Sequence, residues 1–204
     1  MNQRSILIVA ATVVIVASAS IYMHNAVRAD DNNANMANSP DQQKMEREFF
    51  SDAASGNTLE IRAAKLAQER SNDAQVKQAA QMMEQDHTQA NQLIKQLCDQ
   101  AHIDVSVDKL NAVDQAELDQ LEKKQGEMFT HCFVFQQVGC HAKDELMLSY
   151  HANHGQSEAC RQYASQVLPK VQMHLRALEE IARPMAGLTA QAQNSADQMP
   201  PQAH

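Results

Sequence analysis

The sequence predicts an all-α protein whose main domain is a bundle of four long helices, and three observations lead to this prediction. Glycine occurs only 5 times in 204 residues and tryptophan is absent, whereas alanine, glutamine, methionine and leucine dominate. Apolar residues recur every three or four positions through four long stretches, which is the period of an amphipathic helix. Turn-forming residues separate these stretches. A chain of this length can form one domain with a substantial core.

The breaks in the apolar pattern predict the helix bounds. We expect helices over residues 41–70, 74–102, 113–124, 127–153 and 158–182. Ser71-Asn72-Asp73 supplies a tight turn and an N-cap before the second helix, because Asp accepts hydrogen bonds from the first free backbone N–H groups. The first helix is expected to loosen near Ser55-Gly56-Asn57, and the fourth to end at Pro184.

The lengths of the connections predict the order in which the helices pack. Short turns join the first long helix to the second and the third to the fourth, so each pair should form an antiparallel hairpin. Roughly two dozen residues, including the short helix, separate the two hairpins. Such a connection is long enough to run the length of a bundle, as the single crossover of ferritin-like folds does. An up-down-up-down bundle with a decorated loop is the alternative.

The N-terminal residues predict export from the cytoplasm. Arg4 precedes an apolar run over residues 6–17, and Val27-Arg28-Ala29 places small side chains where a signal peptidase cleaves. An uncleaved membrane anchor is the alternative, because apolar character continues to Met23. The predicted organisation is a signal peptide (1–29), a disordered tether (30–40), a four-helix ferritin-like domain (41–185) and a disordered tail (186–204). We therefore expect a periplasmic or otherwise exported protein.

Charge and cysteine content narrow the function classes. The formal net charge of −8 and the lack of a Lys/Arg cluster argue against nucleic-acid binding. Membrane contact is expected only if the N-terminal segment stays uncleaved, and the sequence identifies no protein partner. Of the four cysteines, Cys98, Cys132, Cys140 and Cys160, all but Cys132 fall on apolar stripes and are expected as small buried thiols, with a Cys98–Cys160 or Cys140–Cys160 bridge left open.

Each long helix carries titratable residues on or beside its apolar stripe. They are Glu60 on the first helix, Glu84 and His87 on the second, His141 with Asp144 or Glu145 on the third, and His174 on the fourth. In a Glu-x-x-His pair both side chains project toward the same side of a helix, and ferritin-like di-iron bundles place their ligands in this way. The residue types suit a divalent Zn, Cu, Fe or Mn ion. A buried polar network without metal is the alternative.

Several motifs together resemble a known family. They are Phe50-x-x-Ala-Ala-x-Gly-Asn-x-x-Glu60, Val76-Lys77 with Met83-x-x-Asp86-His87, Phe129, Gln137-Val138-x-x-His141, and Leu168-Pro169-x-x-x-x-His174-Leu175. In combination they resemble the exported bacterial domain-of-unknown-function family 4142. This resemblance implies a ferritin-like bundle behind a signal or anchor, and it implies no activity. Val171 stands where a second Glu-x-x-His would need its glutamate, which departs from the di-iron pattern.

These features lead to one functional hypothesis and two alternatives. The leading hypothesis is an exported binding or stress-response accessory protein with a metal site in the bundle core. The first alternative is an enzyme, namely a metal-dependent oxidase or a peroxide-handling centre, which needs an open coordination position. The second alternative is a metal-free bundle that binds a protein partner. Whether the protein is an enzyme stays open at this point.

Overall fold

The computed structural model describes residues 39–196, and all regular structure in this part of the chain is helical. The helices are α2 (Pro40–Arg70), α3 (Ala74–Ala101), α4 (Ala112–Glu122), α5 (Gly126–His154) and α6 (Glu158–Ala196). The all-α prediction is therefore confirmed. The signal peptide predicted for residues 1–29 and nearly all of the predicted tether lie outside the described residues. Because the chain divides into two units after residue 42, the arrangement below concerns residues 43–196.

The helix ends follow the capping chemistry that the sequence predicts. The Asp73 side chain accepts hydrogen bonds from the backbone N–H groups of Gln75 and Val76, at 2.8 and 3.1 Å. At the other end of α3, His102 adopts a left-handed conformation with φ 56°, and its N–H reaches the free carbonyls of the last turn. Asn111 caps α4 in the same way as Asp73 caps α3. None of the five described helices has the length and apolarity needed to span a membrane.

Helix α2 continues without a break through residues 55–57, so the predicted loosening is wrong. The polar side chains that suggested a weak point have partners on other elements. The Ser55 hydroxyl donates to the carboxylate of Asp114 on α4, and the Asn57 amide donates to Asn91 on α3. Because these side chains bond outside their own helix, they do not compete with its backbone hydrogen bonds.

Helix α6 also continues through Pro184, so the end predicted there is wrong. A proline inside a helix removes one hydrogen bond, and packing can compensate for this cost. Met185, directly after Pro184, is buried in the same apolar cluster as Ile181 and Ala182. The helix then runs to Ala196, within the segment 186–204 that was predicted as a tail.

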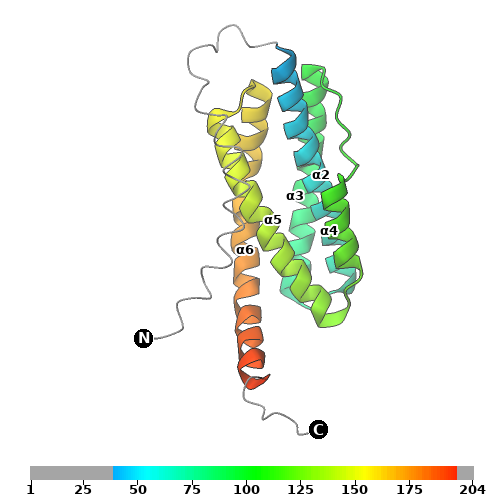
Figure 1. The fold of residues 1–204 in the computed structure, drawn as a ribbon, viewed down its shortest axis with the longest axis vertical. Helices are drawn as coiled ribbons and strands as arrows, with labels where there is room; N and C mark the ends of the chain where they lie inside the picture. Colours follow the sequence, from blue (N-terminus) through cyan, green and yellow to red (C-terminus); the bar gives the residue numbers. More distant parts are fainter. Residues whose placement is uncertain (1–38, 197–204) are drawn as a thin grey trace, which may run out of the picture. The chain divides into compact units, whose positions relative to one another are not determined.

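The apolar core consists of two clusters, and each of the four long helices contributes residues to both. The first core cluster draws mainly on residues 49–54, 90–98, 148 and 160–171, and the second on residues 63–67, 76–83, 129–134 and 178–185. Along the chain, α2 and α6 go from the first cluster to the second, whereas α3 and α5 go from the second to the first. Helices α3 and α5 therefore run in the same direction, with the loop and α4 connecting them (Figure 1).

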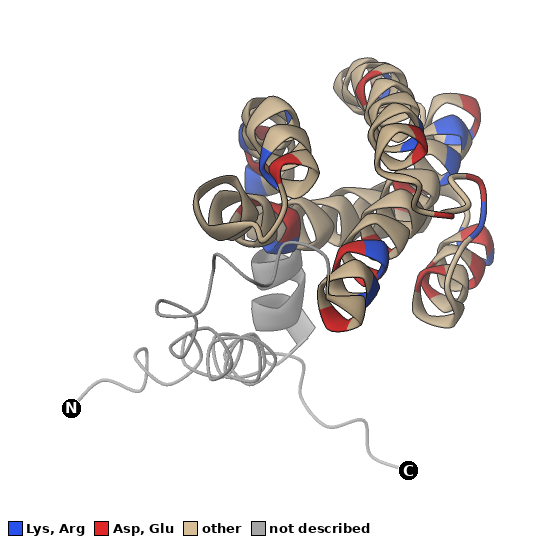
Figure 2. Ribbon diagram, turned by 90° about the horizontal axis from the view of Figure 1, so that it is seen from above, with Lys and Arg blue, Asp and Glu red and all other residues tan. Residues whose placement is uncertain are grey.

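Packing and surface follow from this core. Helix α6 packs along α5 and also contacts α3 (Figure 1). Acidic and basic residues are interspersed along the helices and their connections (Figure 2). The four cysteines are free thiols; Cys98 and Cys160 are buried as predicted, whereas Cys140 is only partly buried, as is Cys132. Burial raises the pKa of Cys98 to about 12 and that of Cys160 to about 11, so both are protonated at neutral pH.

Candidate metal centre

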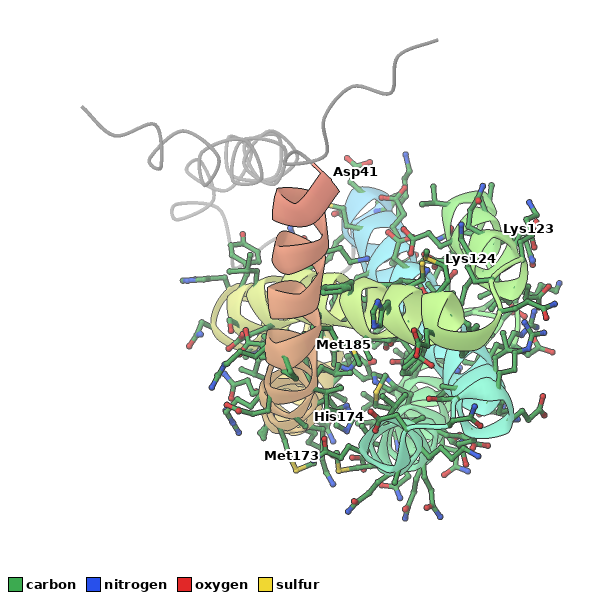
Figure 3. The ribbon with its side chains drawn as sticks, turned by 90° about the horizontal axis from the view of Figure 1, so that it is seen from below. Asp41, Lys123, Lys124, Met173, His174 and Met185 are labelled. Atoms are coloured by element: carbon green, nitrogen blue, oxygen red, sulfur yellow. The ribbon has the colours of Figure 1, made fainter. Side chains whose placement is uncertain are left out.

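A layer of buried polar residues lies between the two core clusters. Each long helix contributes one titratable side chain to it, and Glu60, His87, His141 and His174 are all at most 2% exposed. Seen from below, the labelled His174 lies on the side of α6 toward the other helices (Figure 3). The predicted convergence of four titratable groups, one from each helix, is therefore present in the fold.

The three imidazole rings approach one another closely. Nε2 of His87 lies 3.4 Å from Nε2 of His141, and the latter atom lies 3.2 Å from Nδ1 of His174. The three ligand atoms all lie within 4.8 Å of one another. Two nitrogens bound tetrahedrally to one ion at about 2.0–2.1 Å are about 3.4 Å apart. The two short separations match this value.

A chain of amide hydrogen bonds fixes the tautomer of His87. The backbone carbonyl of Val107 accepts a hydrogen bond from Nδ2 of Asn91 at 2.8 Å, so Oδ1 of Asn91 is the acceptor for Nδ2 of Asn57 at 2.9 Å. This orientation turns Oδ1 of Asn57 toward Nδ1 of His87, 2.9 Å away. Since this oxygen can only accept, Nδ1 of His87 carries the proton. Its Nε2 therefore presents a lone pair to the other two rings.

The same reasoning applies to the other two histidines. Nδ1 of His141 donates to the backbone carbonyl of Gln137 at 2.9 Å, which leaves a lone pair on Nε2. Nε2 of His174 donates to Oδ2 of Asp86 at 2.9 Å, which leaves a lone pair on Nδ1. Lys170 donates to the second oxygen of Asp86 at 3.0 Å and holds the carboxylate in place. All three nitrogens that face the centre are thus acceptors, and outer-shell partners of this kind orient metal-binding histidines.

Glu60 lies beside the outer edges of two of these rings. Its Oε2 is 3.0 Å from Nδ1 of His87, and its Oε1 is 3.1 Å from Nδ1 of His141. Both distances are short enough for an ion pair. Neither oxygen accepts a well-directed hydrogen bond, however, because the N–H groups of the two rings point to Asn57 and to the Gln137 carbonyl. Burial raises the pKa of Glu60 well above its usual range. A positive charge on the far side of the rings would offset this cost.

Burial also keeps the imidazoles neutral. It lowers the pKa of His87 well below its ordinary value, with a smaller contribution from the two neighbouring histidines. It lowers the pKa of His141 to about 3. The pKa of His174 is lowered by burial and partly restored by Asp86. Neutral imidazole is the form that binds a metal ion, because the protonated ring has no free lone pair.

Three other residues predicted as ligands lie elsewhere in the structure. Glu84 accepts a hydrogen bond from Gln68 at 2.6 Å and lies 3.7 Å from Lys65. Asp144 lies 3.9 Å from its neighbour Lys143 and Glu145 accepts from Gln172 at 2.9 Å. Within residues 39–196, the ligand atoms that converge on one point come from the three histidines.

Sequence reasoning missed the partners that orient the rings, namely Asn57, Asp86 and the Gln137 carbonyl. One signal was available for Gln137, because it precedes His141 by four residues and so lies one helical turn away. Asp86 precedes His87 directly and therefore points in another direction from the same helix. Its contact with α6 depends on how the helices pack.

Fold and site together define an all-helical protein with a buried cluster of three histidines. Residues 31–181 match the family model described as a domain of unknown function (DUF4142). The chain belongs to this family, which confirms the resemblance seen in the sequence motifs. No curated protein and no solved structure matches the chain.

Proposed function

We propose that this protein binds one divalent transition-metal ion on His87, His141 and His174, in the core of a ferritin-like four-helix bundle. The observation that carries the proposal is the convergence of three imidazole lone pairs, each fixed by a hydrogen bond on the opposite side of its ring. Metal-binding histidines in proteins have this arrangement, in which a carbonyl or carboxylate holds the second ring nitrogen.

A metal-free network explains the same contacts less well. Two acceptor nitrogens of His87 and His141 face each other at 3.4 Å, and their outer partners leave no proton to place between them. Moving the Nδ1 proton of His87 there would leave the side-chain oxygen of Asn57 without its donor, and such a loss costs about 1–3 kcal/mol for a buried group. A bound cation satisfies all three nitrogens and also offsets the buried carboxyl of Glu60.

Three nitrogen ligands, together with the general affinity order of divalent ions, favour zinc or copper over iron and manganese. Imidazole suits Zn, Cu, Fe and Ni, whereas Mn prefers carboxylate and water oxygens. The carboxyl of Glu60 lies beside the Nδ1 atoms, on the opposite edge of the rings from the converging nitrogens. Together with Val171 at the position where a second Glu-x-x-His would need its glutamate, this arrangement supports a mononuclear centre over a carboxylate-rich di-iron centre.

The order of the helices supports the ferritin-like part of the proposal. Helices α3 and α5 run in the same direction, and the connection between them contains α4. A single long crossover between two antiparallel hairpins produces this order, whereas an up-down-up-down bundle would make α3 and α5 antiparallel. We further propose that the protein is an exported accessory that holds its metal outside the cytoplasm.

A second candidate function, a metal-dependent oxidase or peroxide-handling centre, has one observation in its favour. A cleft between α3 and α6 reaches two of the three histidines, His87 and His174. A centre with three protein nitrogens keeps a coordination position for an exogenous molecule, as catalytic zinc sites with three protein ligands do. Access of this kind is necessary for catalysis and is equally compatible with simple binding.

Metal titration of the tag-free protein tests the proposal. We expect one Zn²⁺ or Cu²⁺ ion per chain by elemental analysis after dialysis. His87→Gln, His141→Gln and His174→Gln should each lose the bound ion, whereas His154→Gln, at an exposed position on α5, should keep it. Folding of each variant is checked by circular dichroism. A folded wild-type protein that retains neither ion would contradict the proposal and leave the metal-free network as the explanation.

A further inference from the structure

A cleft lined by residues of α3 and α6 reaches two of the three histidines of the candidate centre, His87 and His174. Its volume is about 260 Å³, and His87 and His174 form part of its lining. Ala90, Leu93, Val167 and Val171 supply apolar lining, and Asp86, Gln89, Gln166 and Lys170 supply polar or charged lining. A water molecule takes about 30 Å³ in the liquid, so the cleft has room for about eight waters or for a ligand of a few heavy atoms.

We propose, on the basis of the metal site proposed above, that this cleft delivers a small anion to an open position on the bound ion, and that Lys170 attracts it. The chemical class is an anion of a few heavy atoms with a nitrogen or oxygen donor, such as azide or a short carboxylate. Lys170 is a positioning residue in this scheme, and the metal ion is the group that binds the anion directly.

The open position follows from the ligands that the chain supplies. Three imidazole nitrogens converge, whereas zinc and copper sites of this kind take four or five ligands. Glu60 cannot fill the remaining position, because it lies against the Nδ1 atoms of His87 and His141. Asp86 is held by His174 and Lys170 through its two oxygens. The cleft that reaches His87 and His174 is therefore the route by which a fourth ligand arrives.

The preference for an anion follows from the charges around the cleft. The three histidine ligands are neutral, so a divalent ion bound to them keeps its full positive charge. Anions bind such a centre more strongly than neutral molecules do. Lys170 and its ion-pair partner Asp86 both line the cleft, but the Lys170 side chain is 52% exposed and that of Asp86 only 9%, so the ammonium group is the more accessible of the two charges. An ammonium group has three donors, and Asp86 accepts a hydrogen bond from only one of them. Lys170 can therefore hold Asp86 and meet an incoming anion at once.

Azide titration of the Cu²⁺-loaded full-length protein tests this inference. Azide bound to Cu²⁺ produces a ligand-to-metal charge-transfer band, so its growth reports coordination directly. We expect a saturable band in the wild-type protein. Lys170→Met should weaken azide binding about three- to tenfold, the effect of losing one partly screened charge interaction. Lys170→Arg, which keeps the charge, should restore binding to near the wild-type value.

Two further variants make the test specific. Lys95→Met removes a comparably exposed lysine that is ion-paired to Asp99 on α3 at 2.9 Å, and it should leave azide binding unchanged. Gln166→Trp adds a bulky ring at an exposed position of the cleft lining, and it should weaken azide binding while the copper content stays the same.

The outcomes separate this inference from the metal proposal beneath it. Copper that binds stoichiometrically but shows no spectral change with saturating azide overturns the anion site and leaves the metal site intact. Equal azide affinities for wild type, Lys170→Met and Lys95→Met overturn the role of Lys170. Failure of the wild-type protein to bind copper overturns both proposals.

Discussion

Nδ1 of His87 and the side-chain oxygen of Asn57 lie 2.9 Å apart, and this contact decides which nitrogen of the His87 ring carries the free lone pair. The orientation of Asn57 is fixed in turn by Asn91, whose amide donates to the carbonyl of Val107. A backbone carbonyl in the loop between α3 and α4 thereby sets the tautomer of a histidine in the core. The connection between α3 and α4 thus helps to orient one histidine of the candidate metal centre.

Asn57→Leu is expected to weaken metal binding without removing a ligand. Loss of the acceptor frees His87 to adopt the other tautomer, and removal of an outer-shell partner typically costs 10–100-fold in metal affinity. Competition with a chelator of known affinity measures the change. Asn153→Leu, at an exposed position on α5, is the control and should bind metal as the wild type does. Wild-type affinity in folded Asn57→Leu would show that this hydrogen bond does not prepare the site.

Metal removal is expected to destabilise the wild-type protein and to leave His141→Gln unchanged. A ligand that binds only the folded state stabilises it by about 2.7 kcal/mol when present at about 100 times its Kd. Thermal unfolding with added Zn²⁺ and with excess chelator measures this difference for both proteins. Equal unfolding midpoints of the wild type under both conditions would contradict the expectation.

Glu60→Gln should have opposite effects on the metal-free and metal-bound proteins. Without metal, the variant replaces a buried carboxyl that lacks a directed donor, so we expect unchanged or higher stability, by about 1 kcal/mol. With metal, the loss of a carboxylate next to two ligand rings should lower the affinity about tenfold. Urea unfolding under chelation and a metal competition assay give the two values. A decrease in both would assign Glu60 a purely structural role.

The metal-free protein should lose stability in acid through its core histidines. The pKa of His141 is lowered from 6.5 to about 3, so between these values the unfolded state binds a proton that the folded state does not. This contribution is complete above about pH 6.5 and declines as the pH falls toward 3. The raised pKa values of Glu60 and Asp144 act in the opposite direction.

A comparison of two proteins isolates the His141 contribution. Urea unfolding of chelated wild type and His141→Gln is followed from about pH 7.5 to about pH 5. The wild-type free energy of unfolding should fall more steeply with decreasing pH, by up to about 1.4 kcal/mol per pH unit, because the variant lacks one titrating ring. Parallel curves would show that His141 titrates normally in the folded state.

Ser55→Ala should destabilise the fold while leaving metal binding intact. The Ser55 hydroxyl bonds to the buried carboxylate of Asp114 and accepts the backbone N–H of Asn111 at 2.8 Å, which ties α2 to the start of α4. Leaving these groups without that partner should cost about 1–3 kcal/mol. Chemical unfolding measures the cost, and a metal titration at low temperature serves as the control.

Periodicity predicted much of this molecule, because each helix buries a continuous stripe and each site histidine sits within one. His87, for example, lies between Met83 and Ala90 on α3, and both neighbours are buried. Connection lengths predicted two antiparallel hairpins joined by a crossover, with an up-down-up-down bundle as the alternative. Local patterns of this kind depend on one helix at a time, so a single sequence is enough to reveal them.

Features that depend on contacts between helices could not be predicted from the periodicity of each helix alone. Glu60 occupies an inward position as predicted, but its place against the outer edges of two rings depends on the rotation of α2 relative to α3 and α5. The contact of Asp86 with His174 joins α3 to α6 in the same way. The passage of α6 through Pro184 depends on the packing of Met185, which a rule about proline alone does not include.

X-ray absorption spectroscopy of the protein loaded with one equivalent of Zn²⁺ tests the central claim most directly. The three converging lone pairs of His87, His141 and His174 predict a first shell with three imidazole nitrogens at about 2.0–2.1 Å and one further light ligand. Multiple scattering from the rings counts the histidines, and His154→Gln should give the same spectrum. A first shell of oxygens with fewer than three imidazoles, or one containing sulfur, would contradict the account.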